Sequence, residues 1–143
     1  MAKELSALEQ LKASRNPLRV IDDIYKEANE GIPLSNDYIG LLKWYGMYPH
    51  VNSEGLEDKK YFMKRIKLVD TRMNLEQLKV MAKIGRDYAQ GLVDFTTRQN
   101  VQFHFIQIKD MPEIFKLLES VGLTSRMASG DGPRPIMTCP VSG

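Results

Sequence analysis

Cysteine and histidine are scarce in this sequence. Its 143 residues include one cysteine, Cys139, and two histidines, His50 and His104. One cysteine excludes a disulfide within the chain, and it excludes a self-contained iron–sulfur cluster, which takes about four thiolates. Two histidines far apart in the sequence argue against a structural zinc site. We therefore expect no metal site built from this chain's residues alone.

The sequence also lacks an excess of one charge and any long apolar run. The 20 lysines and arginines are offset by 18 acidic residues, which argues against a nucleic-acid-binding role. No segment approaches the roughly 18 consecutive apolar residues of a membrane span, and the first five residues lack the apolar core of a signal peptide. We therefore expect a cytoplasmic protein that does not associate with a membrane, with one domain or a small domain and an arm.

Residues 1–55 have the pattern of a helical N-terminal arm. Leucines recur at helical spacing near the start. Asn16-Pro17 is typical of a helix start, and Gly31 ends the apolar pattern that follows. Residues 50–60, with asparagine, serine, glycine and charges, indicate an exposed loop. We therefore divide the chain into an arm over residues 1–55 and a second unit over residues 56–143.

The second unit alternates between strand and helix patterns. The expected strands cover residues 61–69, 92–97, 101–108 and 134–139. The expected helices begin at Asn74 and Asp110, where Gln77 and Glu113 complete capping-box patterns. The order β-α-β-β-α-β predicts an α+β fold of the ferredoxin-like kind. In that fold two helices cover one face of an antiparallel sheet.

The sheet face away from the helices is expected to carry polar side chains. In the strand over residues 101–108, Phe103 and Phe105 share one face, and Gln102 and His104 share the other. If the helices cover the phenylalanines, Gln102 and His104 project from the open face. The same alternation in the first strand directs Arg65 away from the helices. The open face is therefore the place to look for a site.

Three arginines occupy positions that a folded sheet can bring together. Arg65 lies inside a strand, Arg98 lies between two strands, and Arg134 directly follows the glycine-rich turn 129–133. Guanidinium groups are always charged and present forked donors, which suits carboxylate, phosphate or oxyanion ligands. Neutral donors lie nearby, namely Thr97, Asn100, Gln102 and His104. The alternative interpretation is that the arginines are solvated residues that protect a sheet edge from pairing.

Four segments in order resemble one enzyme family. They are Tyr61–Arg65, Thr96–His104, Gly130–Arg134 and, before them, Trp44–Tyr48. The first three resemble the N-terminal ferredoxin-like half-domain of the sirohaem-dependent nitrite and sulfite reductases. Trp44–Tyr48 resembles the tryptophan-containing segment before that domain in the ferredoxin-dependent branch. The resemblance covers nearly the whole chain.

The resemblance implies a six-electron reductase that converts nitrite to ammonia or sulfite to sulfide. Such enzymes use sirohaem coupled to a [4Fe–4S] cluster, with ferredoxin as the expected electron donor. It further implies that Arg65 and Arg134 bind the substrate anion. Four other residues are implied as sirohaem contacts, namely Arg98, Asn100, Gln102 and His104.

The chain also departs from the family pattern. The cluster cysteines and the two substrate-binding lysines lie in the C-terminal portion of such enzymes, and nothing here matches them. We therefore expect the N-terminal segment of a reductase, inactive alone and completed by the remaining C-terminal portion. We also expect the isolated piece to self-associate. The alternative is a stand-alone module that binds an anionic ligand or RNA. Phe103 and Phe105, expected on the helix side, argue against base stacking.

Overall fold

The computed structural model describes residues 5–51, 57–68, 72–129, 132–133 and 139. The expected strand over residues 134–139 therefore lies outside the described residues except for Cys139, and Arg134 lies outside them too. Among the described residues, no helix is long and apolar enough to cross a membrane.

The N-terminal arm is helical as predicted up to Tyr45. Its helices begin at caps that the sequence supplies, because Ser6 accepts from the backbone N–H of Glu9 and Asn16 accepts from that of Leu18. Gly31, with φ of 69°, ends the longest of them. The elements are α1 (Ala7–Ser14), η1 (Pro17–Arg19), α2 (Val20–Glu30), α3 (Asn36–Ile39) and η2 (Leu42–Tyr45).

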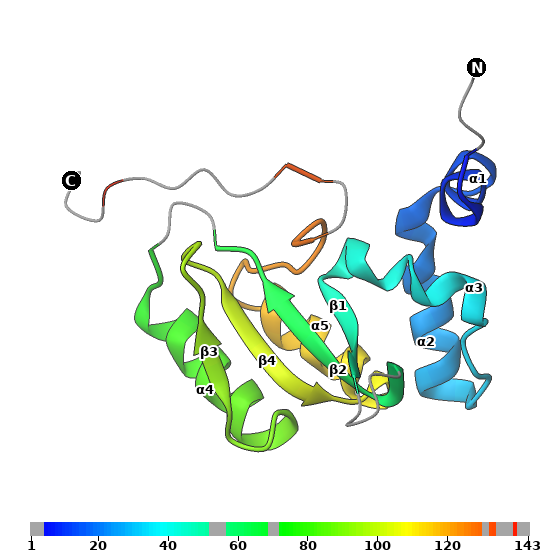
Figure 1. The fold of residues 1–143 in the computed structure, drawn as a ribbon. Coiled ribbons are helices and arrows are strands. Elements are labelled where there is room, and N and C mark those ends of the chain that lie inside the picture. Colours follow the sequence, from blue (N-terminus) through cyan, green and yellow to red (C-terminus); the bar gives the residue numbers. More distant parts are fainter. Residues whose placement is uncertain (1–4, 52–56, 69–71, 130–131, 134–138, 140–143) are drawn as a thin grey trace.

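The rest of the described chain forms a four-stranded sheet with two helices. The elements are β1 (Met47–Val51), β2 (Glu57–Ile66), α4 (Leu75–Tyr88), β3 (Val93–Phe95), β4 (Val101–Ile106), η3 (Ile108–Asp110) and α5 (Met111–Glu119). The strand order is β1-β2-β4-β3, and every neighbouring pair is antiparallel. Helices α4 and α5 lie together on one side of the sheet, as Figure 1 shows. The predicted α+β class with an antiparallel sheet is therefore confirmed.

The strand beside β2 comes from before it in the sequence. Strand β1 pairs with β2 over Met47–Val51, although residues 50–60 were predicted to be a loop and the arm to be helical up to residue 55. That loop prediction is wrong for residues 50–51 and 57–60, which belong to a hairpin. Pro49 is tolerated because β1 is the outer strand of the described sheet and its pairing register shifts after Pro49. The boundary at residue 55 stays a prediction, but the sheet takes strands from both sides of it.

The two predicted capping boxes have different outcomes. Asn74 accepts from the backbone N–H of Gln77 at 2.8 Å, and the Gln77 side chain accepts from the backbone N–H of Asn74 at 3.0 Å. The box predicted for Asp110 and Glu113 is wrong, because the Asp110 side chain makes no cap hydrogen bond. Asp110 ends η3 and already has helical backbone angles, whereas a capping residue normally has extended ones.

Phe105 lies on the opposite sheet face from the one predicted. Phe62 pairs with Ile106 and Lys64 with Phe103, so β4 holds one residue more than β2 between these pairs. This is a β-bulge, and Phe105 adopts a φ of 61° within it. The bulge gives Ile106 the buried position, while the Phe105 ring stacks on His50 with centroids 5.0 Å apart.

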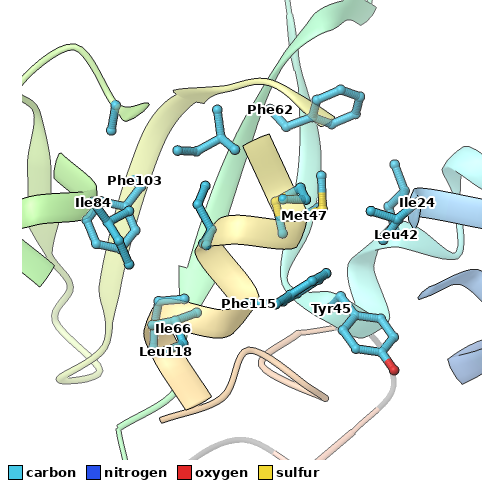
Figure 2. Close-up of a cluster of buried hydrophobic side chains, with 14 of the residues drawn as sticks. Ile24, Leu42, Tyr45, Met47, Phe62, Ile66, Ile84, Phe103, Phe115 and Leu118 are labelled. Atoms are coloured by element: carbon cyan, nitrogen blue, oxygen red, sulfur yellow. The ribbon is translucent and has the colours of Figure 1, made fainter. Parts of the chain in front are cut away.

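The hydrophobic core lies between the sheet, the helices of the arm, and helices α4 and α5 (Figure 2). Phe62 and Ile66 of β2 and Phe103 of β4 are buried against α4, α5 and the arm. Lys64 lies among them with no exposed surface. Its Nζ donates to the Tyr45 carbonyl at 2.6 Å and lies 4.6 Å from the centroid of the Phe115 ring.

Candidate functional site

A cavity of about 390 Å³ opens where β1, β2 and β4 meet the turn before β4, residues 127–129 and residues 132–133. Its described lining includes Arg65 and Arg98, and no aspartate or glutamate. The remaining lining residues are Tyr48, Thr96, Thr97, Asn100, Gln102, Met127, Ala128, Ser129, Gly132 and Pro133. A cavity with two guanidinium groups and no carboxylate among its described walls is suited to an anion.

Sheet register places two of these side chains next to each other. Arg65 of β2 pairs with Gln102 of β4, and cross-strand partners point to the same face of a sheet. Their neighbours Lys64 and Phe103 are buried on the helix side, so Arg65 and Gln102 lie on the face away from the helices. The alternation predicted for Arg65 and Gln102 is confirmed.

A tight turn brings Arg98 to the cavity. The backbone N–H of Thr96 donates to the Asn100 carbonyl at 2.9 Å, and that of Gln99 donates to the Thr96 carbonyl at 2.8 Å. The Thr96 hydroxyl also accepts from the backbone N–H of Asn100. Gln99 closes the turn with a φ of 57°. These bonds fix the loop, so Arg98 lies beside the ends of β2 and β4.

Asn100 holds the framework of the site. It is buried, and its Oδ1 accepts from the backbone N–H of Leu68 at 3.3 Å. This bond joins the residues that follow β2 to the turn before β4. Asn100 contributes to the cavity wall while its side-chain oxygen is used within the protein.

His104 does not line the cavity. Its Nε2 lies 3.1 Å from a carboxylate oxygen of Asp94 on β3. Its ring is next to His50, with centroids 5.3 Å apart, and lies 6.4 Å from Phe105. Of the six predicted site residues, the cavity gathers Arg65, Arg98, Asn100 and Gln102. Arg134 lies outside the described residues, one position after Pro133.

Tyr48 and Ser129 are wall residues that sequence reasoning missed. The Tyr48 hydroxyl and the Ser129 Oγ are hydrogen-bonded to each other, and the Arg65 Cζ lies 5.9 Å from the centroid of the Tyr48 ring. Tyr48 stood inside the Trp44–Tyr48 motif, which was the available signal. Its place at the cavity depends on the pairing of β1 with β2, which was not predicted.

The cavity walls carry donors that suit the cofactor implied by the resemblance. A polycarboxylate macrocycle needs cationic and neutral donors, and the walls supply both. The cavity volume is at the small end of the usual range for ligand sites, about 300–1,000 Å³. It therefore fits a small anion or the carboxylate edge of a larger group. In the described part of the chain, no cluster of three metal-ligating side chains occurs.

Comparison with known proteins gives a family match. Residues 54–121 match the family described as nitrite/sulfite reductase ferredoxin-like half domain. This segment contains β2, α4, β3 and β4 and most of the cavity's polar side chains.

Individual relatives match over almost the whole chain. The chain is 31% identical to a sulfite reductase [ferredoxin] of Mycobacterium tuberculosis over 97% of its length, and covers 28% of that protein. It is 35% identical to an assimilatory ferredoxin-dependent nitrite reductase of Haloferax mediterranei, covering 25% of it. The solved structure of the Mycobacterium tuberculosis NirA protein matches with a TM-score of 0.90 and 29% identity, over 99% of this chain and 28% of that one. The chain thus spans about a quarter of the length of these relatives.

Proposed function

We propose that the chain supplies an anion-binding wall of a ferredoxin-dependent nitrite or sulfite reductase, because residues 54–121 match the family described as nitrite/sulfite reductase ferredoxin-like half domain. The observation that carries the proposal is the cavity itself, which joins Arg65 and Arg98 with no carboxylate among its described walls. The proposed reaction is the six-electron reduction of nitrite to ammonia or of sulfite to sulfide. Ferredoxin is the proposed electron donor.

Arg65 is the proposed substrate-binding residue within the described site. The described residues include no ion-pair partner for its guanidinium, so its donors are available to an oxyanion. Forked N–H donors bind the oxygens of nitrite or sulfite and stabilise the negative charge that builds up as an N–O or S–O bond breaks. Arg134 is proposed to act with it, on the ground of the sequence resemblance and its place next to Pro133.

Arg98, Asn100 and Gln102 are the proposed cofactor-side residues. Sirohaem coupled to a [4Fe–4S] cluster would supply the electron transfer and the iron that binds the substrate. Arg98 supplies a cation for carboxylates, and Gln102 supplies a neutral donor from β4. His104, which does not line the cavity, is also proposed to contact the sirohaem. The cluster ligands are proposed to come from the remaining C-terminal portion of the enzyme.

Calorimetric titration of the chain with sodium nitrite and sodium sulfite tests this function. We expect saturable binding, and we expect R65Q to weaken it by about tenfold or more, because a charge-assisted hydrogen bond contributes about 1.5–3 kcal/mol. R86Q is the matched control, because Arg86 lies on the exposed surface of α4 and pairs with Asp87. Equal affinities for R65Q, R86Q and the unaltered chain would contradict the proposal.

A second candidate, the stand-alone binding module for RNA, gains one observation from the structure. Base stacking needs aromatic rings on the open face, and the Phe105 ring contacts both His50 and Tyr61 there. Filter binding to single-stranded RNA across a salt series separates the two functions. Binding that F105A abolishes would favour the module, and no binding at low salt would exclude it.

A further inference from the structure

We propose that Tyr48 is a positioning residue for the anion cavity, and that its hydrogen bond to Ser129 fixes the Ser129 end of the wall formed by Met127, Ala128 and Ser129. The inference rests on the proposed function, because the ligand is the anion that Arg65 binds. Nothing in the sequence resemblance assigns a role to Tyr48 or to Ser129.

The Tyr48 ring lies near the Arg65 side chain. Tyr48 pairs with Met63 across the β1–β2 ladder. Met63 and Arg65 are two residues apart in β2, so Tyr48 and Arg65 lie on the same face of the sheet. The centroid of the Tyr48 ring is 5.9 Å from the Arg65 Cζ. A guanidinium at this distance from an aromatic ring is attracted by the ring's negative face. The ring therefore restricts the positions available to the Arg65 side chain.

Met127, Ala128 and Ser129 form one wall of the cavity. The backbone N–H of Met127 donates to the Trp44 carbonyl at 2.6 Å, and the Ser129 hydroxyl bonds to the Tyr48 hydroxyl. The wall is thus attached at both ends of the segment 44–48, once through backbone and once through side chains.

The segment 44–48 is also attached to Arg65. The backbone N–H of Arg65 donates to the Gly46 carbonyl at 2.7 Å. Segment 44–48 therefore contacts both the strand that carries Arg65 and the wall that carries Ser129. Of these attachments, the Tyr48–Ser129 bond is made by side chains inside the cavity. Losing it should release the Ser129 end of the wall, while the backbone bonds of Met127 and Arg65 remain.

Calorimetric titration of the full chain with sodium sulfite tests the inference. We expect Y48F and S129A each to raise the Kd for sulfite by about three- to tenfold, the range for one net hydrogen bond. The double variant should be no worse than either single one, because both remove the same interaction. S129T keeps a hydroxyl and should restore the affinity. S120A, which removes an exposed hydroxyl that bonds Leu117 on α5, is the matched control and should change nothing.

The outcomes separate this inference from the proposed function. If R65Q weakens sulfite binding but Y48F and S129A do not, the positioning role is wrong and the anion cavity stands. Additive losses in the double variant, or no rescue by S129T, also contradict the inference. If R65Q binds sulfite as the unaltered chain does, the anion cavity fails and the positioning role fails with it.

Discussion

The backbone N–H of Arg65 donates to the carbonyl of Gly46 at 2.7 Å, and a Cβ on Gly46 would stand 2.4 Å from the Arg65 carbonyl oxygen. The residue that carries the cavity's guanidinium on β2 is thus in direct backbone contact with the residue just before β1. Only glycine allows this approach, and Gly46 also adopts a φ of 69°. The contact connects the site to a part of the chain that sequence patterns assigned to the arm.

Replacing Gly46 is expected to destabilise the protein more than replacing another glycine of the same conformation. Gly31 has the same φ of 69° but nothing within 4 Å of its Cβ position. G31A should therefore show only the conformational cost, about 1 kcal/mol, whereas G46A adds a backbone clash. Urea unfolding measures both. Equal losses in the two variants would show that the close approach to Arg65 is not present.

The buried amine of Lys64 should make stability depend on pH. Burial lowers the pKa of Lys64 well below its ordinary value of 10.5. Between the folded-state pKa and 10.5, the unfolded chain holds a proton that the folded chain has lost. The free energy of unfolding should therefore rise with pH across that window and level off above 10.5.

K64M should remove this dependence, because methionine carries no proton and fits a similar volume. Urea unfolding of both proteins at a series of pH values up to about 10 gives the difference curve, in which the other titrating groups cancel. The account predicts that K64M is favoured most at the low end of the window. A difference curve with no slope would contradict a lowered pKa for Lys64.

The bulge in β4 predicts unequal costs for two phenylalanines. Phe103 is fully buried among the core residues, so F103A should cost about 3–5 kcal/mol of unfolding free energy. Phe105 is half-buried on the open face, so F105A should cost clearly less. Thermal or urea unfolding compares them. If the two losses are equal, Phe105 packs in the core and the bulge is misplaced.

We propose that the isolated chain self-associates through the end of the sheet formed by β3. Strand β3 is last in the strand order of the described sheet, and Phe95 at its end is 66% exposed. An outer strand with an exposed aromatic residue favours pairing with another chain. Sedimentation at high micromolar concentration should show a dimer or larger species that F95E reduces.

L5E is the control for that experiment, because Leu5 is similarly exposed, at 58%, but belongs to the arm. Association weakened equally by L5E and F95E would place the contact elsewhere. A clean monomer of the unaltered chain would end the proposal.

The sequence predicted most elements of the fold because their signals are local. The capping box of Asn74 and Gln77 and the left-handed Gly31 act within a few residues. Strand β1 was missed because it is short, contains Pro49 and owes its conformation to pairing with β2. The position of Phe105 was missed because one inserted residue reverses the alternation after it.

The site, like the fold, was predictable where it depends on local sequence patterns. Arg65 and Gln102 follow from strand alternation, and Arg98 follows from its turn. The hydrogen bond between Tyr48 and Ser129 joins residues 81 positions apart, and no local pattern signals it. His104 shares a face with Gln102 but lies further along β4, next to Asp94 instead of the cavity.

The central claim is that Arg65 binds the substrate anion in the cavity whose wall it shares with Arg98. It is tested most directly by following the side-chain Nε–Hε signals of the arginines in nuclear magnetic resonance spectra as sodium sulfite is added to the chain. We predict that the Arg65 signal shifts and saturates with a single dissociation constant, while the signal of exposed Arg86 does not saturate. An Arg65 shift no larger than that of Arg86 would contradict it.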